Sequence, residues 1–222
     1  MSVGLYAIAL AAALAVRQRD AYGAGHAGVL ERIVEGFVFV RRDRRLVGVL
    51  VITVIYNVFG WPFTSMIPVI AQEHLQLGAK GIGILASLDG VGAFLGALLL
   101  VVYLRQGWYA RVYVWGVASY LILLTMFAVV SHPLPAGAVL VLTGIGSAGF
   151  STMQATLVYL FSPPEMRSRI LGVLSVCIGI GPIGFIGIGA LANVLGANAA
   201  TAAFGLIGLV MLGLTRPIWR HI

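Results

Sequence analysis

The chain has 222 residues, of which 60% are hydrophobic and only 9% are charged, and its mean hydropathy is +1.03. This composition excludes an ordinary soluble globular domain and indicates an integral membrane protein. The net charge of +7 is spread over short segments between apolar runs rather than gathered in one block, which argues against nucleic-acid binding.

The first apolar run covers residues 1–16. It is shorter than the roughly 20 residues that a spanning helix needs. Arg17 and Arg19 follow it directly and no basic residue precedes it, which is the reverse of a secretory signal peptide. We interpret this run as a truncated transmembrane helix.

Residues 17–45 are expected to form a cytoplasmic connector with one amphipathic helix. Apolar residues recur there at helical spacing between charged ones: Val29, Leu30, Ile33, Val34, Phe37 and Val38. A helix of this kind lies in the membrane interface. Its basic end, RRDRR, would lie among lipid headgroups and act chiefly as a topology anchor.

Six longer apolar segments follow, and each is long enough to cross about 30 Å of hydrocarbon as an α-helix. The predicted spans are 46–71, 81–104, 112–130, 137–161, 170–192 and 198–215. Residues 216–222 would form a cytoplasmic tail. The sequence therefore predicts an all-α integral membrane protein with a six-helix domain over residues 46–215.

The loops between these spans differ in charge. If the spans alternate in direction, every arginine falls on one side of the membrane, and Lys80 is the only firm positive charge on the other. By the positive-inside rule the arginine side is cytoplasmic, which places the C-terminus inside the cell.

Small residues and prolines indicate where helices pack closely or bend. Gly92 and Gly96 form a GxxxG pair, which permits close helix approach in lipid. Gly181, Pro182 and Gly184 should bend the fifth span, because proline removes a helical hydrogen bond and glycine lowers helix propensity. The first span, with NVFGWPFTSMIPVIA, should be irregular toward its outer end.

Asp89 is the one ionisable side chain deep inside a predicted span. It lies nine residues after Lys80, or roughly 13 Å at the helical rise, near the middle of the bilayer. No Lys, Arg or His lies in a span to pair with it, so the carboxyl group should favour its neutral form. Asp89 is thus predicted either to exchange a proton or accept a cationic substrate, or to serve packing alone as a protonated carboxyl.

Asn57 and Gln154 are the next candidates for the substrate or proton pathway, although hydrogen bonding between helices would explain them equally. No nucleophile, base and acid are grouped, and no metal-ligand spacing occurs. The lone Cys177 can form no internal disulfide. We therefore expect no enzyme activity, no cofactor and no metal.

Three stretches resemble the C-terminal half of a major facilitator superfamily transporter, in the branch of bacterial enterobactin and macrolide exporters. EGFVFVRRDRRLVGVL, with the spans after it, is similar to the central loop and the seventh and eighth helices. YLRQGWYAR resembles the degenerate Asp-Arg-x-Gly-Arg-Arg loop, matching at Arg105 and Gly107 but not at the acid or the basic pair. SPPEMRSRILGVL resembles the Pro-x-Glu-x-Arg-Gly-Arg loop, matching at Glu165, Arg167 and Arg169.

The resemblance implies twelve spans in two halves with the substrate site between them. It also implies a gating role for the loop residues, although the positive-inside rule alone would account for their arginines. These residues are Arg105, Gly107, Arg111, Glu165, Arg167 and Arg169. At Asp89 the branch more often has a small or apolar residue, so the resemblance does not support a role for this acid.

Together these observations predict a secondary active, proton-coupled exporter of small amphipathic molecules, such as drugs or siderophores, in a bacterial plasma (inner) membrane. The chain would be a C-terminal half that acts with a missing N-terminal half. A homodimeric six-span transporter, in which a second copy takes that place, and a non-transporting scaffold or inactive remnant are the alternatives.

Overall fold

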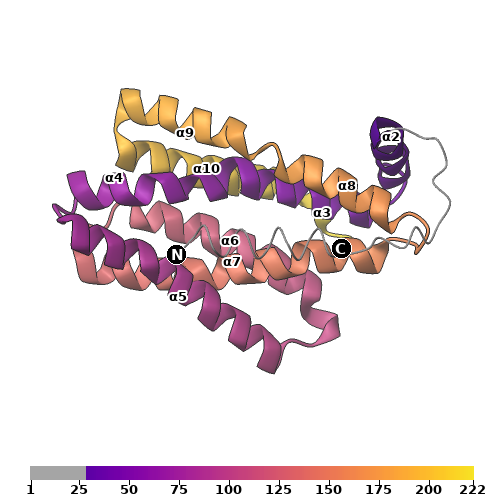
Figure 1. The fold of residues 1–222 in the computed structure, drawn as a ribbon, viewed down its shortest axis with the longest axis horizontal. Coiled ribbons are helices and arrows are strands. Elements are labelled where there is room, and N and C mark those ends of the chain that lie inside the picture. The colour runs from indigo at the N-terminus through magenta and orange to yellow at the C-terminus, as the bar shows by residue number, and fades with distance from the viewer. Residues whose placement is uncertain (1–28) are drawn as a thin grey trace, which may run out of the picture. The chain divides into compact units, whose positions relative to one another are not determined.

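The computed structural model describes residues 29–222, and this part of the chain consists of helices joined by short loops and turns (Figure 1). Residues 33–222 form one compact unit. The predicted truncated helix over residues 1–16 and the first part of the predicted connector lie outside the described residues.

Six helical segments of the described chain are long and apolar enough to cross a membrane, which confirms the predicted fold class. The first, Arg44–Glu73, consists of α3 (Arg44–Ile55), a π-helical segment η1 (Tyr56–Gly60), a 3₁₀ segment η2 (Trp61–Ser65) and α4 (Met66–Glu73). The next three are α5 (Ala79–Tyr103), Gln106–Phe127 with η3 (Gln106–Trp108) and α6 (Tyr109–Phe127), and α7 (Pro133–Phe161).

The fifth span, Arg167–Leu195, is divided into α8 (Arg167–Ile178) and α9 (Gly181–Leu195), and α10 (Ala197–Leu214) is the sixth. Several spans differ by a few residues from the predicted ranges. The fourth begins at Pro133 rather than at residue 137, because proline fits the first turn of a helix, where its missing N–H has no intrahelical acceptor.

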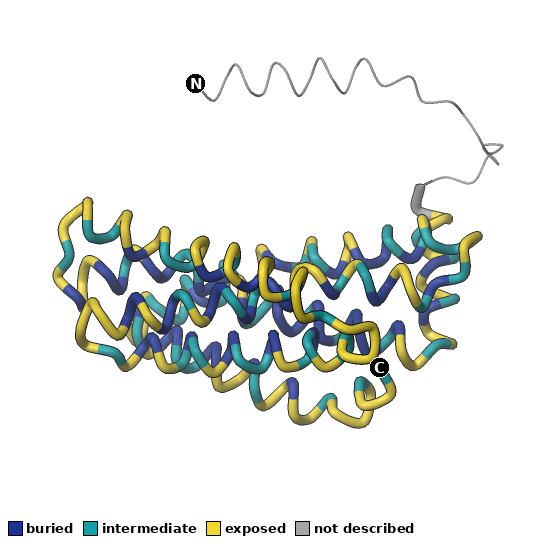
Figure 2. The backbone as a smooth tube through the Cα atoms, turned by 90° about the horizontal axis from the view of Figure 1, so that it is seen from below, coloured by how far each residue is buried: buried dark blue, intermediate teal, exposed yellow. Residues whose placement is uncertain are grey.

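The first span and α7 are the most buried of the six, and α5 is the least buried. Helix α7 packs between α5 and α6, and α10 packs against α6 and α9. Buried positions face the interior of the bundle, whereas exposed ones lie on its outer faces and at its ends (Figure 2). Toward its C-terminal end α5 diverges from its neighbours (Figure 1), and Val101, Val102 and Tyr103 are exposed there.

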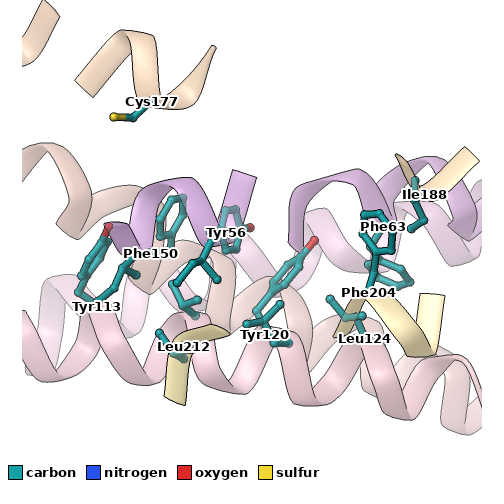
Figure 3. Close-up of a cluster of buried hydrophobic side chains, with 14 of the residues drawn as sticks. Tyr56, Phe63, Tyr113, Tyr120, Leu124, Phe150, Cys177, Ile188, Phe204 and Leu212 are labelled. Carbon is teal, nitrogen blue, oxygen red and sulfur yellow. The ribbon is translucent and has the colours of Figure 1, made fainter. Parts of the chain in front are cut away.

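A line of aromatic rings connects the first, third and fourth spans in the interior (Figure 3). Successive ring centroids are 3.8 to 6.4 Å apart, as expected for favourable aromatic pairs. In order along the bundle the rings belong to Tyr113, Phe150, Tyr56, Tyr120, Phe63 and Phe127. This line fixes α6 and α7 against the irregular part of the first span.

Helix α2 (Val29–Val40) corresponds to the amphipathic helix expected in the connector. Its Gly36 lies against the backbone carbonyl of Arg169 in α8, and the Arg169 guanidinium forms an ion pair of 3.0 Å with Glu35. Val34, Phe37 and Val38 remain exposed and give α2 an apolar outer face.

Residues 216–222, expected to be a tail, fold back onto the bundle. They begin with the short helix α11 (Arg216–Trp219), which packs against α3. The Trp219 indole N–H donates a hydrogen bond of 2.8 Å to the Leu212 carbonyl, and Ile222 lies against Gly48.

Candidate functional site

Asp89 lies in the middle of α5, where this helix approaches α7 most closely. A side chain on Gly144 of α7 would overlap the Asp89 carbonyl oxygen, and one on Gly92 would overlap the Val141 carbonyl oxygen. One turn farther along, a Cβ on Gly96 would come within 2.8 Å of the Ala148 methyl group. Glycine at these positions therefore lets the two backbones touch and fixes the position of Asp89.

The Asp89 side chain is partly buried, and its Oδ1 atom is buried without a hydrogen-bond partner among the described residues. Tyr56 and Tyr120 lie within electrostatic range of this carboxyl group. The Tyr56 hydroxyl interacts electrostatically with the Tyr120 and Ser147 hydroxyls, while the Ser147 hydroxyl donates its hydrogen bond to the Gly144 carbonyl, at 3.0 Å. We call Asp89, Tyr56, Tyr120 and Ser147 the central polar cluster.

The central polar cluster takes one residue from each of the first four spans. Tyr56 begins the π-helical segment of the first span, and π-helical segments often occur at functional sites. Its ring stacks on Phe150 with centroids 3.8 Å apart. Gly60 is the last residue of this segment, and its missing side chain lets the rings of Tyr56 and Tyr120 pack close to the backbone. A Cβ there would lie only 3.2 to 3.3 Å from them.

The surface of α5 beside Asp89 is open and built of small residues. Ala86, Ser87 and Gly90 are exposed, and a Cβ on Gly90 would meet no atom within 4 Å. The rest of the described chain leaves this side of α5 uncovered.

A second buried hydrogen-bond group lies nearer the arginine-bearing end of the bundle. The Tyr113 hydroxyl donates to the Val49 carbonyl at 2.9 Å and contacts the Thr53 hydroxyl at 2.8 Å. The Thr53 hydroxyl also reaches the Val49 carbonyl, at 3.0 Å. These groups satisfy one another, so this arrangement joins α3 to α6 and offers nothing to a ligand.

The structure does not bring Asn57 or Gln154 into the central polar cluster. Asn57 is only 4% exposed, and its amide donates to the Thr53 carbonyl one turn earlier, at 2.8 Å. Gln154 lies seven residues after Ser147 on α7, about two helical turns away. Its Oε1 is buried without a hydrogen-bond partner among the described residues.

The interruptions of the first and fifth spans lie against each other. The break between α8 and α9 falls at residues 179–180, and Gly181 and Pro182 open α9. A side chain on Gly184 would overlap the Val58 carbonyl oxygen, and a Cβ on Gly181 would lie 3.0 Å from the Trp61 ring. The irregular segments of both spans thus meet at one contact, which is where a pivot between their two ends would lie.

The loop residues at the arginine-bearing end form few contacts. Arg167 and Arg169 are the exceptions. Arg167 donates to the Tyr159 hydroxyl at 2.9 Å and lies 3.9 Å from the centre of that ring, and Arg169 forms the ion pair with Glu35. The side chains of Arg105, Arg111 and Glu165 make no hydrogen bond or ion pair within the described part of the chain. A Cβ on Gly107 would meet no atom within 4 Å.

Three members of the central polar cluster, Tyr56, Tyr120 and Ser147, were not predicted from the sequence. Tyrosine and serine are ordinary in spanning helices, and only their meeting with Asp89 in space distinguishes them. The described residues contain no group of His, Cys, Asp and Glu that could hold a metal ion.

Comparison with known families gives one match to this chain. The family model described as Major Facilitator Superfamily matches residues 49–218, which includes all but the first residues of the six spans. No match is found among the curated proteins.

Proposed function

Since the chain belongs to the Major Facilitator Superfamily, a family of membrane transporters, we propose that it is one half of a proton-coupled exporter of small amphipathic molecules, with Asp89 as the proton-carrying group. The observation that carries the proposal is the buried, unpartnered Asp89 carboxyl oxygen within electrostatic range of the phenols of Tyr56 and Tyr120. Placing an ionisable group at this depth in the membrane costs free energy, so such groups are rare and usually mark a functional site.

The central polar cluster supports a coupling role because its members come from four spans. Protonation of Asp89 would remove a charge that acts on Tyr56 and Tyr120, and Tyr56 in turn lies near Ser147, so α5, α6, α7 and η1 would all respond. The π-helical and 3₁₀ segments of the first span leave it fewer regular helical bonds to break, and its contact with the break in the fifth span gives a place for both to bend.

The partner that we propose is an N-terminal six-helix half that covers the outer side of α5. Small exposed residues on this side, Ala86, Ser87 and Gly90, allow another helix to approach closely, as membrane helices prefer. The substrate would then lie between the halves, next to Asp89. The sparsely bonded Arg105 and Glu165 remain available to contact the other half when the arginine-bearing side is closed. Arg167 and Arg169 would hold that loop in place through Tyr159 and Glu35.

The gathering of the arginines at one end of the bundle favours a plasma-membrane protein with this end in the cytoplasm. Amphipathic substrates are favoured because the Asp89 carboxyl group lies on an otherwise apolar helix.

The proposal is tested by reconstituting the 222-residue chain in proteoliposomes, alone and together with an N-terminal half from a full-length member of the family. Uptake of a panel of amphipathic dyes, drugs and siderophores is then followed under an imposed pH gradient. We expect transport only when both halves are present. Transport by the chain alone, with crosslinking between introduced Gly90→Cys residues, would assign the partner position to a second copy. If no compound moved in either preparation, the exporter proposal would be wrong.

A further inference from the structure

A groove at the arginine-bearing end of the bundle, away from the central polar cluster, has a volume of about 640 Å³ and lies between α6, α10 and α11. Its walls are apolar, with Val114, Ala118, Leu209 and Leu212 among them. The same groove is bordered by Arg111, Arg216, Arg220, Trp115 and Trp219. It thus combines an apolar channel with three guanidinium groups.

The folded-back C-terminal residues create this arrangement. The hydrogen bond from Trp219 to the Leu212 carbonyl and the contact of Ile222 with Gly48 hold α11 against the bundle. Arg216 and Arg220 are one helical turn apart and therefore lie on the same side of α11. Arg111 approaches from the first turn of α6, across the groove.

No acidic side chain in residues 29–222 neutralises these three arginines. No Asp or Glu lines the groove. Within the described part of the chain, Arg111 and Arg216 have no ion-pair partner, and Arg220 contacts only the neighbouring His221, at 3.4 Å. Like charges held together repel one another, so the site favours an anion, and guanidinium groups bind phosphate oxygens in pairs.

The position of the groove selects a lipid over a soluble anion. Arg111 and Arg216 lie at the ends of two spanning helices, at the depth of the lipid headgroups. Trp115 is 69% exposed, and tryptophan is enriched at this interface. Gly213 lines the channel, and the space where its Cβ would lie is empty to a distance of 4 Å, so a larger side chain there would enter the channel.

We propose that this groove binds one anionic phospholipid, with its phosphate on Arg111, Arg216 and Arg220 and an acyl chain between α6 and α10. Phosphatidylglycerol fits this chemistry. No acidic side chain among the lining residues would bind the ammonium group of a zwitterionic lipid.

Native mass spectrometry of the 222-residue chain in detergent, with equal amounts of phosphatidylglycerol and phosphatidylcholine, tests the proposal. The variant Arg111→Gln/Arg216→Gln/Arg220→Gln removes the headgroup site. Its matched control, Arg41→Gln/Arg42→Gln/Arg44→Gln, removes as many exposed arginines from the same end of the bundle. Gly213→Leu fills the channel and leaves all charges in place.

We expect the wild type and the control to retain phosphatidylglycerol selectively. The groove variant should lose on the order of a hundredfold in this preference, at about fivefold for each arginine. Gly213→Leu should also weaken retention. Equal losses in the groove variant and the control would overturn the proposal, because the attraction would then be general. Complete displacement of the lipid by millimolar inorganic phosphate would overturn it in favour of a soluble-anion site.

Discussion

The α-carbon of Gly144 in α7 faces the backbone carbonyl oxygen of Asp89 in α5 so closely that any side chain on Gly144 would overlap it. The position of Asp89 is therefore set by direct contact between the backbones of α5 and α7, which leaves no space for a side chain at Gly144. The free energy of unfolding and the geometry of the central polar cluster should both depend on this contact.

Gly144→Ala is expected to destabilise the protein by about 1–3 kcal/mol, the usual cost of overpacking, since backbone must move. Gly90→Ala is the control, because its methyl group enters open space on the other side of α5. The control should leave stability unchanged or raise it by up to about 1 kcal/mol through helix propensity. Unfolding in mixed micelles, followed by circular dichroism, measures the free energy of unfolding of both variants. Similar changes in the two variants would contradict the close contact between Gly144 and Asp89.

The buried phenol of Tyr113 gives a second prediction. Tyr113→Phe removes its hydrogen bonds to the Val49 carbonyl and the Thr53 hydroxyl. Hydrogen bonds between membrane helices contribute about 0.6 kcal/mol on average and up to about 1.7 kcal/mol, and a loss in this range is expected in the same unfolding assay. Tyr103→Phe, at a position that is 70% exposed, should have no effect. A loss as large at Tyr103 would show that the hydrogen bonds of Tyr113 are not responsible.

The attachment of α2 to α8 gives a third prediction. Gly36→Ala should detach α2, because the new Cβ would lie 2.7 Å from the Arg169 carbonyl oxygen. Glu35→Gln should have a smaller effect, since an exposed ion pair contributes at most about 1 kcal/mol. Hydrogen exchange in α2 reports on both. The control Gly172→Ala has its nearest contact at 3.8 Å, to Ile33, and should leave exchange unchanged. Slow exchange in Gly36→Ala would refute this account of the docking.

The six spans could be predicted from the sequence because the bilayer demands only length and apolar composition. The break near Gly181 and Pro182 could also be predicted, because it results from the backbone properties of these two residues themselves. The irregular part of the first span was predicted from the stretch that contains Gly60 and Pro62, and η1 and η2 fall there. Pro68, later in the same stretch, lies in the regular helix α4.

The candidate site could be predicted only in part. Asp89 stands out because charge is rare in lipid-crossing helices. Its neighbours Tyr56, Tyr120 and Ser147 come from three other spans, and the contacts that bring them together depend on which helices pack side by side. Spacing along the chain carries no information about such contacts. The folded-back Trp219 escaped prediction for the same reason.

The orientation of the bundle gives a fourth prediction. In a Cys177→Ser background, Ser131→Cys and Ser168→Cys place single thiols at exposed positions on opposite ends. A membrane-impermeant maleimide should label Ser131→Cys in intact cells, and Ser168→Cys only after permeabilisation. The wild-type Cys177, which is buried, should remain unlabelled without permeabilisation. The opposite pattern at the two introduced cysteines would place the arginine-bearing end outside the cell.

The central claim is that the Asp89 carboxyl group carries the proton that drives export. Its most direct test is substrate-induced proton movement, recorded with a pH-sensitive dye inside proteoliposomes that contain both halves of the transporter. Asp89→Asn should abolish the proton signal. The control Glu73→Gln, which replaces an exposed acid at the end of the bundle away from the arginines, should retain it. An undiminished number of protons moved per substrate in Asp89→Asn would contradict the claim.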